Sequence, residues 1–415
     1  MVEKFKQKQL FLEPGKSSGK IKIEKLCALI ESHPCKEDIY KVFDIEKIKN
    51  NYISIDYVDV VYDRIWSLLS NFKRHKIIAE TKNIDIYEEI GADNNETQIV
   101  FNFEEYLDID EVKEDLKAIA IYDSKNTFLD EYVMTKYANN LFKIGQPELA
   151  NYNVKYFKQM AKSNDSYNKE RSYRLVDFDG TTYVRGITSL RYYEYGIEFT
   201  FVVGILSLYK NMQNNPGVEY EIKSAAISES KLEIIAAEKF PKKADSFGYI
   251  TSAVRMTTND LGTGSLNFSN IINVLIKDST GFYLIPKKNS TVENSSLVIN
   301  HNTKPDNVFE SLKGMDGILN TTDNFIEELK SVKTINTPDE LRVKILSKIQ
   351  SPRSNFKFIK KLSDIFNRKI DNEISNFNKL LEMCNKAEEL DIEYDLKDKL
   401  RYIISDIILY GMSRD

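Results

Sequence analysis

The sequence predicts an α+β fold in three parts. A mixed, mostly helical N-terminal domain spans residues 1–150, a central antiparallel β-rich domain with helices spans 151–300, and a helical region spans 301–415. Apolar residues recur at helical spacing in the first part, and polar and apolar residues alternate from about Asn151. A segment rich in Asn, Ser and Thr precedes the last part. With 415 residues, the chain is long enough for two or three domains that each bury a core.

The first part combines amphipathic helix with one short strand. A helical stripe is formed by Val58, Val61, Ile65 and Leu68. Residues 98–103, "QIVFNF", read as a strand, and we expect a helix from about Asp110. The segment from Glu80 to Asp115 is acidic, which is typical of a solvated face and is also suited to docking a basic partner.

The central part begins with a predicted hairpin. Its strands are Tyr173–Asp177 and Thr182–Thr188, joined by a turn at Asp179-Gly180. The next segment, "IEFTFVVGILSLYKNM", is apolar enough for a buried strand or a buried helix, and periodicity does not decide between them. Two further strands are expected on either side of a turn at Ser228 to Ser230.

The segment "ITSAVRMTTNDLGTGSLNF" predicts two strands around a tight turn. Ile250–Met256 alternates as a strand, and Asn259-Asp260 begins the turn. Gly262 and Gly264 are expected to take positive φ before the next strand, Ser265–Phe268. The turn needs no ligand, although its amides and Arg255 offer an anion contact.

The C-terminal part is expected to be helical. Residues 287–307 read as a loop-rich connector. Thr337, Pro338 and Glu340 form the signature of a capped helix start. The apolar stripe of this helix consists of Leu341, Ile345, Leu346 and Ile349.

Composition indicates a soluble cytoplasmic protein. The formal net charge is −5, so the chain as a whole is not basic and any anion-binding site must be local. Cys27, Cys35 and Cys384 are too few and too scattered for a disulfide framework. No apolar run is long enough to span a membrane, and the N-terminus lacks the apolar core of a signal peptide.

The sequence lacks the common catalytic motifs. It has no phosphate-binding loop, no nucleophile elbow and no dinucleotide-binding fingerprint, so we expect no enzyme, no cofactor and no metal. A metal-dependent nuclease is the one enzyme considered, as a third choice. Its candidate residues are Asp177, Asp179, Glu221 and Lys223 in strands, and the Glu111–Lys113 triplet at the start of the expected helix.

Basic and aromatic residues suggest another chemistry. On a sheet surface, arginines neutralise phosphates and tyrosines stack on unpaired bases, as in single-strand binding. Core tyrosines and solvated arginines are the alternative. The candidate nucleic-acid contacts are Arg171, Arg174, Arg185, Arg191, Tyr183, Tyr192, Tyr193, Arg255, Lys357 and Lys361.

Two segments of the central part carry a family resemblance. The first contains Arg185, Ile187, Ser189, Arg191 and Tyr192, and the second contains Asn259, Gly262, Gly264, Ser265 and Leu266. In this order they resemble the phage- and plasmid-borne family catalogued as domain of unknown function 932, over roughly residues 171–275. The resemblance implies a mobile-element setting, and there is a looser analogy to annealing proteins of the Red-beta and RecT type.

Two functions of different classes follow as hypotheses. The first is a mobile-element protein that binds single-stranded nucleic acid without turnover, in annealing or replication. The alternative is an oligomeric protein-interaction or assembly subunit in a phage-conflict setting, which the acidic N-terminal third suggests. Neither involves a membrane.

Overall fold

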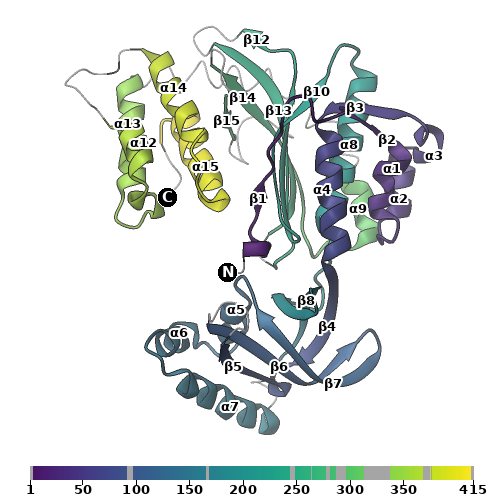
Figure 1. The fold of residues 1–415 in the computed structure, drawn as a ribbon, viewed down its shortest axis with the longest axis vertical. Helices are drawn as coiled ribbons and strands as arrows, with labels where there is room; N and C mark the ends of the chain where they lie inside the picture. The colour runs from purple at the N-terminus through teal and green to yellow at the C-terminus, as the bar shows by residue number, and fades with distance from the viewer. Residues whose placement is uncertain are drawn as a thin grey trace.

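The protein is built around two β-sheets, as Figure 1 shows. The computed structural model describes residues 3–90, 97–164, 168–243, 248–262, 264–276, 281–286, 296–312, 337–367, 374 and 376–412. One sheet is large and lies between layers of helices, and the other curls into a barrel below it. The α+β class expected from the sequence is confirmed.

The large sheet collects strands from the whole chain. Its main path is β15-β14-β13-β11-β10-β3-β2, and β1, β12 and β16 pair at its sides. The central four strands are antiparallel and span Tyr220–Ile227 (β10), Lys231–Glu238 (β11), Tyr249–Asn259 (β13) and Leu266–Leu275 (β14). The shorter strands are Lys8–Gln9 (β1), Lys20–Lys22 (β2), Tyr52–Asp56 (β3), Lys242–Lys243 (β12), Phe282–Leu284 (β15) and Ser296–Ile299 (β16).

One face of this sheet is covered by α4, Val58–Asn71, and α8, Gly196–Asn214. The segment that periodicity left undecided is therefore a helix, α8. It is apolar all round because it packs against the sheet on one side and other helices on the other. The helices α1 (Ile23–Cys27), α2 (Lys36–Val42), α3 (Ile45–Ile48) and α9 (Pro305–Leu312) complete this layer.

The opposite face of the sheet carries the C-terminal helices. Ile234 faces α8, whereas its neighbour Ile235 lies in the cluster with Tyr402 of α15. These helices are α12 (Pro338–Gln350), α13 (Lys360–Phe366), α14 (Phe377–Glu388) and α15 (Tyr394–Tyr410), with the short η6 (Asn355–Phe358) before α13. The capping box at Thr337 and Glu340 is present as expected.

The second sheet closes into a barrel. Its strands are β4 (Lys73–Glu80), β5 (Ile84–Ile90), β6 (Thr97–Asp108), β7 (Glu111–Ala120), β8 (Glu170–Phe178) and β9 (Thr181–Thr188). Their cyclic order is β4-β6-β7-β9-β8, antiparallel except for β7 beside β9, and β5 extends β6. The helices between β7 and β8 are α5 (Ser124–Asp130), α6 (Thr135–Lys143) and α7 (Pro147–Ser163). This is the strand order of an OB-type barrel, with its helical insert between the third and fourth strands.

The barrel changes two expectations. The segment after Asp110 is strand β7, not a helix, because it pairs with β6 from Glu111 onward. The division expected at residue 150 does not follow the sheet, since β4 to β7 before it and β8 and β9 after it share one barrel. The predicted hairpin at Asp179-Gly180 is confirmed as β8 and β9.

The connector and the glycine turn are also defined. Residues 287–295 of the connector lie outside the described residues, and Ser296–Ile299 forms β16 rather than loop because it pairs with β14. Gly262 takes the expected positive φ of 90°. Gly264 does not, and it is required for a different reason: a Cβ there would lie 2.5 Å from the Cβ and 2.7 Å from the carbonyl oxygen of Asn259.

Substitution of Gly264 tests this packing. Gly264→Ala is expected to lower the free energy of unfolding by about 1–3 kcal/mol, because the new methyl group overlaps the Asn259 backbone. Urea denaturation measures this, with the adjacent Ser265→Ala, which adds no atoms, as the control. Equal stability of the two variants would contradict the close approach.

Candidate functional site

Several predicted nucleic-acid residues face inward. Arg174 and Arg185 leave β8 and β9 toward the joint between barrel and large sheet, and Arg185 is 1% exposed. Tyr183 and Tyr192 are also buried. The hypothesis of an exposed arginine and tyrosine face on this hairpin is therefore wrong for these residues, because their side chains are enclosed by protein.

The buried arginines converge on two glutamates. Arg185 bonds Glu194 and donates to the Ser230 hydroxyl at 2.9 Å. Arg74 of β4 lies 2.5 Å from Glu198 of α8 and 3.6 Å from Glu194. We call Arg74, Arg174, Arg185, Glu194 and Glu198 the arginine cluster. Despite burial, which acts in the opposite direction, the surrounding guanidinium groups lower the pKa of Glu194 to about 2.

Asp260, directly after β13, lies beside this cluster, and Nε2 of His301 is 3.7 Å from one of its carboxyl oxygens. Glu229 accepts hydrogen bonds from the hydroxyls of Tyr122 and Ser230 at 2.7 Å and lies near Arg185. Arg74 and Arg185 act on Asp260 through their charges, yet neither of its carboxyl oxygens has a hydrogen-bond partner among the described residues. Burial raises its pKa to about 8, with the negative charge of Glu194 as a further cause. The sequence indicated Asp260 only as the start of a turn.

Arg255 belongs to a second buried cluster. Its guanidinium lies 2.8 Å from Glu233 of β11 and 2.6 Å from Asp398 of α15. Arg401 of α15 contacts the same Glu233 at 2.6 Å. The expectation that Arg255 contacts an external anion is therefore wrong. Its side chain is buried and forms ion pairs that link α15 to the sheet.

The other predicted contacts are more accessible. Arg171 pairs with Glu131 of the α5–α6 loop at 2.7 Å. Arg191 and Tyr193 are exposed in the loop that follows β9. Lys357 and Lys361 are exposed on η6 and α13 beside Phe358, which is 81% exposed. The ten residues thus do not form one surface.

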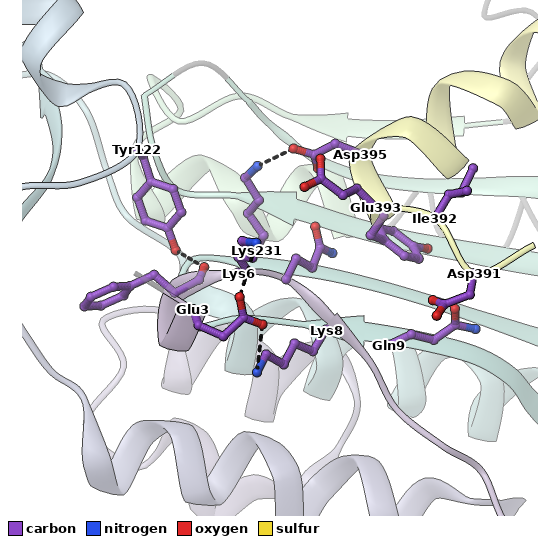
Figure 2. Close-up of a pocket in the computed structure, with 13 residues that line it drawn as sticks. Glu3, Lys6, Lys8, Gln9, Tyr122, Lys231, Asp391, Ile392, Glu393 and Asp395 are labelled. Atoms are coloured by element: carbon purple, nitrogen blue, oxygen red, sulfur yellow. Dashed lines mark hydrogen bonds and ion pairs between the residues drawn. The ribbon is translucent and has the colours of Figure 1, made fainter. Parts of the chain in front are cut away.

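Three adjoining cavities lie where the parts of the fold meet. Figure 2 shows a cavity of about 770 Å³ between the N-terminal segment, Tyr122 after β7 and the start of α15. Cavities of about 470 and 330 Å³ adjoin it, because all three share Lys231. We call them together the junction groove.

Charges in the junction groove are mixed. Its basic lining residues are Lys6, Lys8, Arg185, Lys231 and Arg255, and its acidic ones are Glu3, Asp123, Glu233, Asp391, Glu393, Asp395 and Asp398. Lys231 lies 3.4 Å from Asp395, and Lys6 and Lys8 both pair with Glu3, as the dashed lines in Figure 2 indicate. The carboxylates outnumber the cations, so the groove is poorly suited to a phosphodiester backbone, which needs concentrated positive charge.

The barrel carries a hairpin rich in carboxylates, two of which are paired with lysines: Asp108 with Lys113 and Glu104 with Lys158. In OB-type barrels the second and third strands form the ligand face, which here are β6 and β7. We call residues 104–116 of this hairpin the acidic hairpin. It contains one lysine, Lys113, and seven carboxylates: Glu104, Glu105, Asp108, Asp110, Glu111, Glu114 and Asp115.

The acidic hairpin is also unusually exposed. Every residue from Ile109 to Asp115 is accessible, with Ile109 at 87% and Val112 at 68%. Ile109 takes a φ of 57°, which is rare for a β-branched residue and marks backbone strain at the tip. The acidic sequence pattern predicts a solvated, charged segment, and the structure places it on the paired strands β6 and β7 rather than on the expected helix.

The nuclease candidates do not come together as a metal site. Asp177 accepts a hydrogen bond from Thr182 in the barrel, whereas Glu221 pairs with Lys223 at 2.7 Å in the large sheet. Within the described ranges, no group of three His, Cys, Asp or Glu side chains is arranged to hold a metal ion. No described helix has the length and apolarity that crossing a bilayer requires.

The burial of Asp260 predicts a dependence of stability on pH. Its folded pKa, about 8, exceeds the ordinary value of 3.8, so its contribution is full below about pH 4 and is lost as pH rises through 8. Asp260→Asn has no proton to lose and should gain stability over the parent as pH rises through this window. Urea unfolding across that range measures the difference; a constant difference would contradict the raised pKa.

Comparison with known proteins assigns no function. No protein-family model matches the chain, and neither a curated protein nor a solved structure matches it. The resemblance to domain of unknown function 932 therefore rests on the residues named for it and is carried forward as a proposal.

Proposed function

We propose that the protein is an interaction subunit that docks a basic surface of a partner protein. The observation that carries this proposal is the acidic hairpin, which bears seven carboxylates and one lysine on the strands where OB-type barrels bind ligands. A fold alone does not determine a function, so the charge of this face decides the class of ligand.

The electrostatics of the hairpin favour a cationic ligand. Carboxylates repel phosphates, so a nucleic acid is disfavoured on this face, whereas lysines and arginines of a partner are attracted. The exposed side chains of Ile109 and Val112 add apolar area of the kind that interfaces bury. The proposed setting is a cytoplasmic mobile-element system, in keeping with the family resemblance and with three buried free thiols.

Neutralising the hairpin tests this function. The triple variant Asp110→Asn, Glu111→Gln and Glu114→Gln should bind a lysine-rich peptide about tenfold more weakly at low salt, since each exposed charge contributes a few tenths to about 1 kcal/mol. Fluorescence anisotropy measures the affinity, and added salt should reduce the difference.

A matched control removes the same number of charges elsewhere. Glu37→Gln, Glu148→Gln and Glu382→Gln change exposed carboxylates on α2, α7 and α14. This variant should bind the peptide like the parent. An equal loss in both triple variants would attribute binding to net charge and contradict a site on the hairpin.

Single-stranded nucleic acid is the second candidate, and a different surface supports it. Phe358 is exposed on η6, and the Lys357 ammonium lies 4.8 Å from the centre of its ring. Lys361 is exposed on the adjacent α13. A flat ring beside cations suits an unstacked base and its phosphate, and the OB-type strand order is compatible with this ligand class.

This second candidate makes its own prediction. Lys357→Gln with Lys361→Gln should weaken oligonucleotide binding and lower the salt dependence by roughly two phosphate contacts. Titration of a fluorescent single-stranded oligonucleotide at several salt concentrations measures both. Unchanged binding, or none at low salt, would eliminate this surface, and the acidic-hairpin variant serves as the control that should not weaken it.

A further inference from the structure

We propose that the partner adds a strand to the outer edge of β7, as an extended segment with basic side chains. This inference rests on the proposed function, and it specifies how the acidic hairpin binds. It follows from three observations: an unpaired strand edge, its side-chain charge, and the absence of a covering helix along that part of the barrel as described.

The outer edge of β7 is free over most of its length. From Glu111 to Ala118 its strand partner is β6 alone, and β9 joins β7 at Ile119 and Ala120. Backbone groups that point away from β6 in this stretch therefore face outward. An extended peptide satisfies such groups by continuing the sheet.

The register identifies those outward groups. Asp108 pairs with Glu111 across the two-residue turn Ile109-Asp110, which makes that pair the hydrogen-bonded one. Hydrogen-bonded pairs alternate along antiparallel strands, so the N–H and C=O groups of Val112 and Glu114 point away from β6. Asp115, with a φ of 61°, ends the regular stretch.

Side chains along this edge select the partner. Glu111 lies on one face of β7 and Glu114 on the other, because successive side chains alternate in the regular stretch before Asp115. A second copy of the hairpin would bring like charges into register, which is unfavourable. Lysine or arginine at the cross-strand positions would instead form opposite-charge pairs. Pairing with a basic strand is therefore favourable, and pairing with a second copy of this edge is not.

Two other strand edges among the described residues are covered. The helix α7 packs along β5 at another edge of the barrel, and α15 packs on β15, where the Ser405 hydroxyl accepts from the Ile285 amide at 2.8 Å. In contrast, β7 is exposed at each position from Glu111 to Asp115. Charged side chains alone would protect a short edge strand from pairing with another chain. The exposed apolar side chains of Ile109 and Val112 do not protect it, and they suit cross-strand contacts with a bound segment.

The test uses a fluorescent peptide of alternating lysine and valine and the same peptide N-methylated at alternate residues. Methylation keeps the charges and removes backbone donors along one edge. The unmodified peptide should bind about tenfold more tightly, the effect of one or two hydrogen bonds. Backbone hydrogen exchange at Val112 and Glu114 should slow when the unmodified peptide binds. Glu114→Pro removes both the charge and the backbone donor, so it should weaken binding more than Glu114→Gln, which removes the charge alone.

The outcomes separate the two proposals. Equal affinity for both peptides, or binding without slower exchange in β7, would overturn strand addition and leave the proposed function standing. No binding of either peptide would overturn both. Slow exchange at Val112 and Glu114 in the free protein, together with a dimer by sedimentation, would mean that a second copy occupies the edge and would overturn a basic partner there.

Discussion

The structure depends on burying three guanidinium groups between the barrel and the large sheet. Arg74, Arg174 and Arg185 come from three barrel strands, and Glu194 and Glu198 stand at the start of α8, which packs on the sheet. A buried charge without its partner costs several kcal/mol, so each arginine requires these carboxylates in place. The barrel is thereby held in one orientation by contacts that apolar packing alone would not define.

The same requirement explains why the site could not be assigned from residue types. Arginine and tyrosine at alternate strand positions are consistent with a nucleic-acid face, but the same residues are consistent with a buried ionic joint. The difference lies in the location of the counter-ions. Glu194 follows the hairpin closely, yet Asp260 and Glu229 are far along the chain and only the tertiary fold brings them near Arg185.

Local features of the fold were predictable where short-range chemistry decides them. The hairpin at Asp179-Gly180 and the capped helix at Thr337 both follow from a few adjacent residues. Strand β7 was missed because charged residues such as Glu111 and Lys113 have low strand propensity, and pairing with β6 overrides that preference. The barrel itself was beyond prediction, since its closure joins Ile78 to Leu107 and Ile119 to Tyr183 across long loops.

The distribution of charge separates what this barrel shares with others from what is its own. Strand order fixes where a ligand face can lie, because β6 and β7 present one surface whatever their side chains. Side chains then fix the ligand, and here carboxylates replace the cations that a polyphosphate would need. Arg174 and Arg185 of strands β8 and β9 are buried in the arginine cluster, whereas Arg171 of β8 pairs with Glu131. The same barrel thus buries arginines at its joint with the large sheet and exposes carboxylates on β6 and β7.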